Sequence, residues 1–292
     1  MNAVPVETRA RFKFDFYMLD VHLTNRCNLH CDGCNHWSNY SLSGLFSNAT
    51  LRAWAEPWTE KVSPRRINLL GGEPFLNKEY PEIIATYRSL FPDSTLKIFT
   101  NGFLLSKQHG LHECLKENNA ILIVTDHSRD PRYRGKLDKE LSTIASWGER
   151  RLKKETWFRK VYDLNGVEVE IRDMKGHWYK TYTGNGVNAR PYKDNNPRKS
   201  WEECVSKNSV QLYQGKLYKC GTIAYLNDFL EKFELREHPD WAGYCNYQAL
   251  SPECTDGELK QFLLREEEEI CRMCPAHPEK VSDKEVFVIK KA

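Results

Sequence analysis

The fold of this chain is decided by residues 15–34, which read DFYMLDVHLTNRCNLHCDGC. Residues 17–24 form a short apolar run that predicts a first β-strand. Cys27, Cys31 and Cys34 follow directly, at C-x3-C-x2-C spacing. Three thiolates cannot complete a tetrahedral zinc site without a fourth ligand, whereas a [4Fe-4S] cluster can take three cysteines and keep one iron open. The spacing therefore favours a cluster, and a zinc knuckle completed by His30 or His36 is the alternative.

Two more predicted strands end in short polar motifs. Residues 66–70 run into Gly71-Gly72-Glu73-Pro74, and residues 95–100 run into Asn101-Gly102. In a parallel αβ barrel the active site lies at the carboxyl ends of the strands. Three successive strands would therefore bring these motifs and the cysteine loop to one rim, which favours the cluster over zinc.

Short apolar runs alternate with amphipathic segments through the first two thirds of the chain, the pattern of βα units and a parallel sheet. Residues 51–62, 81–91 and 104–117 are predicted helices, 120–125 and 167–171 are predicted strands, and 136–163 are expected to hold one or two helices. Residues 178–183 alternate as a strand does. Only six residues separate them from residue 171, however, too few for a crossover helix.

The cysteine triplet, the GGEP motif and the TNG after the third strand resemble the radical S-adenosylmethionine (SAM) superfamily over residues 15–175. The resemblance implies an α/β fold, a partial (β/α)6 TIM-like barrel in residues 1–197, whose open iron binds the amino and carboxylate groups of SAM. The cofactor-binding residues it implies are Gly71, Gly72, Glu73, Pro74 and Asn101, with Glu73 accepting hydrogen bonds from the ammonium group of SAM. Gly33 stands where members of the superfamily usually carry an aromatic residue, so Trp37 becomes a candidate for contact with the adenine.

A second, smaller module is predicted in residues 198–292, with a β-hairpin at residues 209–213 and 216–219 and helices at 223–233 and 257–269. Its cysteines are spaced as in the abbreviated SPASM, or twitch, modules of certain radical SAM enzymes. This resemblance implies an auxiliary [4Fe-4S] cluster for electron transfer, held by Cys204, Cys220, Cys271 and Cys274. Structural zinc is the alternative for this site. Cys114 is expected to be a small buried residue, and Cys245 and Cys254 are left over.

The expected activity is that of a radical SAM oxidoreductase. It is similar to the aminocyclitol dehydrogenases of the superfamily, which oxidise an alcohol to a ketone after 5'-deoxyadenosyl radical abstraction of hydrogen. The expected substrate is a sugar, an aminocyclitol or a phosphorylated derivative, and the electron donor is expected to be of flavodoxin or ferredoxin type. A peptide-modifying radical SAM enzyme that forms crosslinks or thioethers is the alternative.

Substrate-contacting residues are predicted by position alone. Arg172, Glu170 and Glu168 alternate with the apolar face of the strand at 167–171, so they are expected to point into the barrel, and Asp126 and His127 end the strand before it. Arg172, Glu170 and Asp126 are the predicted catalytic residues. Salt bridges inside the barrel are the competing interpretation.

Composition restricts the class of protein. The 292 residues include 10 cysteines, too many for core filler, and the formal net charge is +3. Residues 129–200 hold 18 Lys and Arg against 10 Asp and Glu, a candidate face for an anionic substrate.

No apolar run approaches the roughly 20 residues of a membrane span, and residues 1–13 lack the apolar region of a secretory signal. We expect a cytoplasmic protein without a membrane or nucleic-acid partner. A zinc-stabilised binding module that uses the basic stretch remains the alternative of another class.

Overall fold

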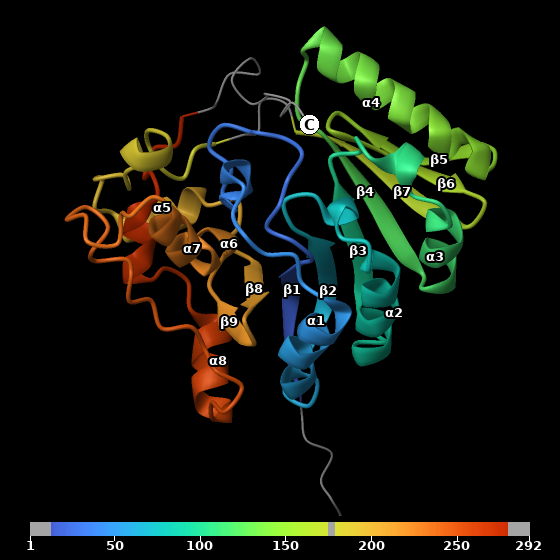
Figure 1. The fold of residues 1–292 in the computed structure, drawn as a ribbon. Helices are drawn as coiled ribbons and strands as arrows, with labels where there is room; N and C mark the ends of the chain where they lie inside the picture. The colour runs from blue at the N-terminus through green and yellow to red at the C-terminus, as the bar shows by residue number, and fades with distance from the viewer. Residues whose placement is uncertain (1–12, 175–178, 280–292) are drawn as a thin grey trace, which may run out of the picture.

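The computed structural model describes residues 13–174 and 179–279, and a nine-stranded sheet is its central element (Figure 1). The strands are β1 (Phe14–His22), β2 (Val62–Leu70), β3 (Thr95–Thr100), β4 (Ala120–Asp126), β5 (Arg150–Thr156), β6 (Arg159–Leu164), β7 (Val167–Asp173), β8 (Ser209–Tyr213) and β9 (Lys216–Tyr218). Their order across the sheet is β5-β6-β7-β4-β3-β2-β1-β8-β9. Six neighbouring strands, β8-β1-β2-β3-β4-β7, are mutually parallel. The fold is thus the expected α/β partial barrel.

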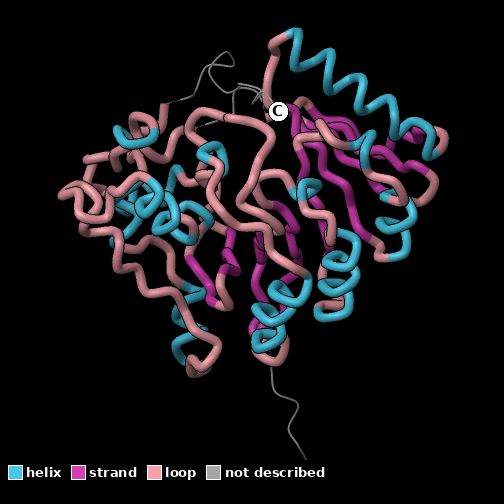
Figure 2. The backbone as a smooth tube through the Cα atoms, in the orientation of Figure 1, coloured by secondary structure: helices cyan, strands magenta, loops and turns pink. Residues whose placement is uncertain are grey.

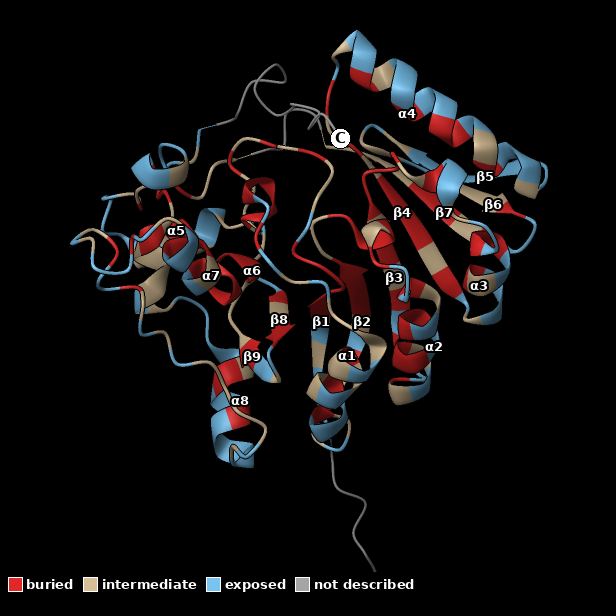
Figure 3. Cartoon of the chain, in the orientation of Figure 1, coloured by how far each residue is buried: buried red, intermediate tan, exposed pale blue. Residues whose placement is uncertain are grey.

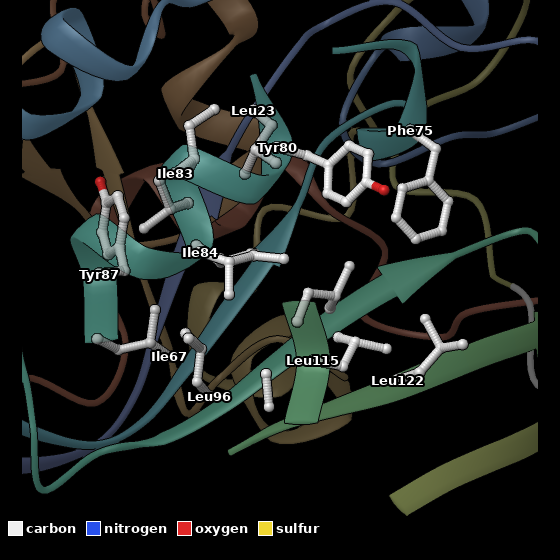
Figure 4. Close-up of a cluster of buried hydrophobic side chains, with 14 of the residues drawn as sticks. Leu23, Ile67, Phe75, Tyr80, Ile83, Ile84, Tyr87, Leu96, Leu115 and Leu122 are labelled. Atoms are coloured by element: carbon white, nitrogen blue, oxygen red, sulfur yellow. The ribbon is translucent and has the colours of Figure 1, made fainter. Parts of the chain in front are cut away.

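The helices that follow the parallel strands cover the outer face of the sheet (Figure 1). The helices are α1 (Asn48–Ala55), α2 (Tyr80–Leu90), α3 (Leu111–Glu117), α4 (Pro131–Thr143), α5 (Pro197–Glu203), α6 (Gly221–Ala224), α7 (Leu226–Lys232) and α8 (Asp256–Leu264). Apolar side chains of α2 pack against the strands, including Ile83 and Ile84 beside Ile67 and Leu96 (Figure 4). The central strands are accordingly largely buried (Figure 3). None of the helices described is long and apolar enough to cross a bilayer.

Several predicted helices are shorter in the structure. The first begins three residues before the predicted start, where the Ser47 hydroxyl accepts a hydrogen bond from Thr50 N (3.1 Å), and ends at Ala55. The third is divided into a 3-10 turn, Leu105–Lys107, and α3, because Gly110 takes a left-handed conformation (φ 72°). The helix predicted at 223–233 is likewise divided into α6 and α7.

The helical prediction for residues 136–163 is only half right. Helix α4 and a 3-10 turn (Ile144–Trp147) occupy its first part, but β5 and β6 form an antiparallel hairpin in the second. Lys, Arg and Glu in this stretch favour a helix by intrinsic propensity. The free edge of β7 outweighs that preference, because β6 hydrogen-bonds to it along six residue pairs.

The sixth parallel strand comes from an unexpected part of the sequence. Strand β8 pairs in parallel with β1, from Met18 opposite Ser209 to Val21 opposite Leu212. The predicted β8–β9 hairpin therefore exists and extends the barrel sheet. Residue 178 lies outside the described residues, and residues 179–183 form only isolated bridges, including that between Thr183 and Arg190.

The segments between α7 and α8 are mostly loops and turns (Figure 2). They are held by a second apolar cluster, in which Trp37 stacks between Tyr182 (ring centroids 4.2 Å apart) and Phe229 (4.1 Å). Helix α8 begins with a capping box of Thr255 and Glu258 and ends at Leu264, five residues before the predicted end. This cluster packs the C-terminal segments against the loop that follows β1.

Candidate functional site

A cavity of about 560 Å³ lies at the carboxyl ends of the parallel strands and extends into the barrel. Cys27, Cys31 and Cys34 line it, together with Gly71, Gly72 and Asn101. Side chains of β1, β2, β3 and β7 line the same cavity; they are Met18, Asp20, Arg66, Asn68, Phe99 and Arg172. The structure therefore brings the three predicted strand-end motifs to one site.

The cysteine loop carries features that suit a metal cluster. The Cys27 sulfur accepts a hydrogen bond from Leu29 N (3.4 Å), and the Asn101 amide nitrogen lies 4.0 Å from it. N–H donors directed at sulfur favour the thiolate, the form that binds metal. Asn101 also donates to the Asn28 side chain (2.7 Å), which ties the third strand end to the cysteine loop.

Gly71 and Gly72 allow the second strand end to pack against the cysteine loop. Gly72 N donates to Thr24 O (2.9 Å) and Glu73 N donates to Arg26 O (2.8 Å). A Cβ on Gly72 would lie 2.1 Å from Arg26 O, and one on Gly71 would lie 2.4 Å from Thr24 O. The sequence predicts close approach to a ligand, and the structure shows that close approach between the two loops needs these glycines as well.

Glu73 occupies a different place from the one expected. It is fully buried and is not among the residues that line the cavity. Its carboxylate accepts hydrogen bonds from Thr100 Oγ1 (2.7 Å), Asn101 N (2.8 Å) and Phe75 N (3.3 Å). Burial raises the pKa of Glu73 to about 7, against the effect of these donors. Glu73 therefore joins the ends of β2 and β3, and Pro74 begins the 3-10 turn beside it.

Of the residues predicted to contact substrate, Arg172 and His127 line the cavity. Glu170 is buried lower in the barrel, where its Oε1 accepts from Arg172 Nε (2.9 Å) and Nη2 (2.8 Å). Glu168 is paired with Lys153 (2.7 Å). Asp126 forms an ion pair with Arg134 of α4, outside the cavity lining. The salt-bridge interpretation therefore describes Glu168, Glu170 and Asp126 in this structure.

Polar residues within apolar strands form a part of the site that sequence reasoning missed. Asp20 and Asn68 lie opposite each other on β1 and β2, and Asn68 Nδ2 donates to Asp20 Oδ1 (2.6 Å). Ser209 of β8 donates to the other oxygen of Asp20. The signal was present in the sequence as a polar residue among the apolar residues of each strand, at residues 20 and 68.

Trp37, the candidate for contact with the adenine, lies away from the cavity, and Gly33 packs against Lys180. Trp37 is fully buried in the second apolar cluster, where its indole nitrogen donates to Thr222 O (2.9 Å), so it does not line the cavity. Gly33 has a φ of 67°, and a Cβ on it would lie 2.7 Å from the Lys180 side chain. Lys180 in turn pairs with Asp32 (2.5 Å). The stem of Lys180 thus occupies the space beside Gly33.

The four cysteines of the second predicted site lie close enough together to shift one another's pKa values. Burial, with smaller contributions from the neighbouring Cys204 and Cys271, raises the pKa of the Cys220 thiol to about 12. Burial likewise raises the pKa of Cys274, which is also affected by Cys204, Cys220 and Cys271. The Cys204 sulfur accepts a hydrogen bond from Ser206 N (3.3 Å), and Ser206 lines the cavity.

Among the residues described, no group of three or more His, Cys, Asp or Glu side chains meets the geometry of a single metal-ion site.

The remaining cysteines lie elsewhere. Cys114 of α3 is half-buried, not fully buried as predicted, and packs against the main core; burial raises its pKa to about 11. The Cys245 thiol donates to Trp241 O (3.3 Å), and Cys254 packs against the main core near Lys61.

Residues 21–140 match the model of the Radical SAM superfamily. This part of the chain, which contains the cysteine triplet, GGEP and TNG, is a radical SAM domain, and such a domain implies a [4Fe-4S] cluster and SAM as cofactors. Its curated relatives include the GTP 3',8-cyclase of Vibrio atlanticus, 34% identical over 109 residues, or 34% of this chain and 31% of the relative. The GTP 3',8-cyclase of Yersinia pestis is 35% identical over 107 residues, 34% of this chain and 31% of that protein. The chain thus matches about a third of the length of these relatives.

Solved structures with a similar arrangement include BtrN in complex with AdoMet and 2-DOIA. The match has a TM-score of 0.46 and 16% identity, and covers 90% of this chain and 94% of BtrN. SuiB of Streptococcus suis bound to S-adenosylmethionine matches with a TM-score of 0.37 and 15% identity, over 47% of this chain and 31% of SuiB.

Proposed function

We propose that this chain is a radical SAM oxidoreductase that acts on a small polar substrate, such as a sugar, an aminocyclitol or a phosphorylated derivative. The observation that carries the proposal is the single cavity that joins Cys27, Cys31 and Cys34 to the polar interior of the barrel. When bound, the cluster and SAM supply a 5'-deoxyadenosyl radical, which removes a hydrogen atom from a substrate carbon.

The chain's own residues would position these groups. The three cysteines would hold the cluster and leave one iron open to SAM. The backbone at Gly71 and Gly72 lines the adjacent wall, and Asn101 is held there by the buried carboxylate of Glu73. A substrate bound in the barrel would contact its polar side chains and displace water from the cavity.

The second cysteine group would complete an oxidation. A substrate alcohol that has lost a hydrogen atom must lose one further proton and one electron to become a ketone. An acceptor held by Cys204, Cys220, Cys271 and Cys274 would take that electron, and Ser206, two residues after Cys204, lines the substrate cavity. The position of this group beside the cavity supports the electron-transfer role.

Iron and sulfide analysis of anaerobically reconstituted protein tests the proposal. We expect about eight irons per chain, four for each of two clusters, and formation of 5'-deoxyadenosine from SAM under dithionite. The triple variant Cys27→Ala, Cys31→Ala, Cys34→Ala should retain about four irons and form none. Cys114→Ala, which removes a thiol from α3, is the matched control and should behave as wild type. If the triple variant still forms 5'-deoxyadenosine, or if the protein binds zinc without iron, the proposal is wrong.

GTP belongs among the first substrates to assay, because the curated relatives are named GTP 3',8-cyclase. The assay compares 5'-deoxyadenosine formation with and without GTP, and then examines the nucleotide for change. A GTP-dependent increase with a converted nucleotide would replace the oxidation proposed above with the reaction named for the relatives.

A further inference from the structure

The inside of the barrel contains more cationic than anionic groups. Arg66 of β2 and Arg172 of β7 line the cavity, Lys97 of β3 lies opposite Asn68 in the register, and Arg159 of β6 lies 3.7 Å from Glu170. Burial lowers the pKa of Lys97; Glu170 and Glu168 oppose that shift, while Arg66 and Arg172 add to it. These groups are therefore close enough to repel one another.

The carboxylates nearby are already engaged. Glu170 accepts from Arg172 and lies beside Arg159. Asp20 accepts from Asn68 and from Ser209, and burial raises its pKa, which favours its neutral form. These acids do not offset all of the cations around them.

Arg66 is held in the barrel by contacts with uncharged groups. Its guanidinium lies 4.9 Å from the centre of the Tyr17 ring, donates to the Tyr17 hydroxyl (3.3 Å) and contacts the Met18 sulfur. Within residues 13–174 and 179–279, no carboxylate forms an ion pair with it, although Asp20 attracts it at longer range, and its buried Nε has no hydrogen-bond partner. Leaving a buried charged donor without an acceptor is costly, and an anionic ligand would remove that cost.

The position of Arg66 fits a substrate-binding role. It precedes Leu70, the last residue of β2, by four residues, or about 13 Å along a strand. A ligand in the cavity could therefore reach Arg66 at one end and the cysteine rim at the other. Asn68, between the two, has a buried Oδ1 without a hydrogen-bond partner among the described residues and can accept from a hydroxyl or amine.

We propose that the substrate carries an anionic oxygen group, a phosphate or a carboxylate, which Arg66 binds inside the barrel while Asn68 accepts a hydrogen bond from a neighbouring hydroxyl or amine. This inference rests on the proposed function and narrows its substrate class. Phosphate and carboxylate both match the planar fork of an arginine.

Calorimetric titration of anaerobically reconstituted, SAM-loaded protein tests this inference, with glucose 6-phosphate, glucuronate, inorganic phosphate and glucose as probes. We expect an anionic probe to bind at least ten-fold more tightly than glucose. Arg66→Gln should weaken that binding by about 10-fold or more, the usual effect of losing a charged hydrogen bond. Arg66→Lys keeps the charge without the fork, so its affinity should lie between those of wild type and the Gln variant.

Arg65→Gln is the matched control. Arg65 is the preceding residue on β2, but its side chain is exposed and pairs with Asp15 outside the barrel (2.5 Å), so anion binding should stay at the wild-type level. A preference between glucose 6-phosphate and glucuronate identifies the anionic group. Circular dichroism establishes whether the variants are folded. If Arg66→Gln does not fold, the affinity of Arg66→Lys for the anionic probes tests the proposal instead.

Four results would overturn the proposal: no anionic probe binds wild type, glucose binds as tightly as the anions, Arg66→Gln binds the anions as wild type does, or Arg66→Gln weakens only SAM binding. The last would assign Arg66 to the carboxylate of SAM. Failure of the proposed function is seen separately, as missing iron or missing 5'-deoxyadenosine in wild-type protein without any probe.

Discussion

The absence of a side chain at Gly72 determines how closely the loop after β2 can approach the cysteine loop after β1. A Cβ there would lie 2.1 Å from Arg26 O and 2.8 Å from Cys27 N, and both are backbone atoms that cannot move aside without moving the cysteine loop. The glycine is therefore required for the position of Cys27 and not only for access of a ligand.

We predict that Gly72→Ala lowers the iron content of the reconstituted protein by about half, because the first cluster loses its ligand geometry while the second does not. Gly135→Ala is the control, since a Cβ on this helical glycine meets nothing within 4 Å and should raise stability by about 0.5–1 kcal/mol. Iron analysis after anaerobic reconstitution provides the measurement. Full iron content in Gly72→Ala would contradict the steric argument.

His127, which follows the last residue of β4, makes the stability of the fold sensitive to acid. Burial lowers the pKa of His127 to about 4, below the ordinary value of 6.5. Between these two pH values the unfolded chain binds more protons than the folded protein does. The stability that comes from neutral His127 is therefore complete above pH 6.5 and is lost as the pH falls toward 4.

We predict that His127→Gln reduces the acid sensitivity of the unfolding free energy. Between pH 7 and pH 5 the variant should lose about 1–2 kcal/mol less than wild type, because it lacks this proton uptake. Urea unfolding at the two pH values measures the difference, and exposed His109→Gln should behave as wild type. Equal losses in wild type and His127→Gln would exclude His127 as a source of the acid sensitivity.

At the scale of elements, Glu73 is the link between two strand ends. It follows β2, yet its carboxylate accepts from Thr100 and Asn101 at the end of β3. Because Asn101 lines the cavity and also donates to Asn28 in the cysteine loop, displacement of Glu73 would be transmitted to all three motifs.

We predict that Glu73→Ala weakens SAM binding by roughly 10-fold or more while both clusters remain, since Asn101 N and Thr100 lose a buried acceptor. Glu79→Ala removes an exposed carboxylate from the same segment and should bind SAM as wild type does. Equilibrium binding of SAM and iron content are the two measurements. An unchanged SAM affinity in a folded Glu73→Ala variant would show that the link does not position the binding site.

The β5–β6 hairpin shows how an element can be misjudged from its residues. Its charged composition favours a helix. The edge of β7, however, presents a row of backbone donors and acceptors, and these would have no protein partner if this stretch were helical. Pairing with that edge decides the structure. Nothing within residues 136–163 identifies β7 as the partner.

At the scale of the whole molecule, the second cysteine group joins distant segments. Cys204 follows α5, Cys220 follows β9, and Cys271 lies in the 3-10 turn Glu269–Met273. Ser200 Oγ donates to Cys274 O (2.8 Å), so the last of these segments is also held by α5.

We predict that Cys271→Ala, Cys274→Ala lowers the iron content from about eight to about four and leaves a folded protein that still forms 5'-deoxyadenosine. The physical reason is that the C-terminal segments have an apolar core of their own, centred on Trp37 and Phe229. Circular dichroism, iron analysis and SAM cleavage on one preparation test this, with Cys254→Ala as control. Loss of all three signals together would instead show that metal binding supplies the folding free energy of this part of the chain.

The sequence by itself determined the parallel βα pattern, the cysteine triplet and the strand-end motifs. These depend on local periodicity and on spacing within single loops, which a linear reading can detect. It also predicted the β8–β9 hairpin from its turn residues.

The tertiary contacts set which strand pairs with β1 on its outer side, which groups the Glu73 carboxylate contacts, and which cations inside the barrel have no ion-pair partner among the described residues. Each of these depends on contacts between residues far apart in the chain, such as Asp20 with Ser209. Sequence spacing carries no information about such contacts, because the burial and pairing of a polar group are set by what the rest of the fold places around it.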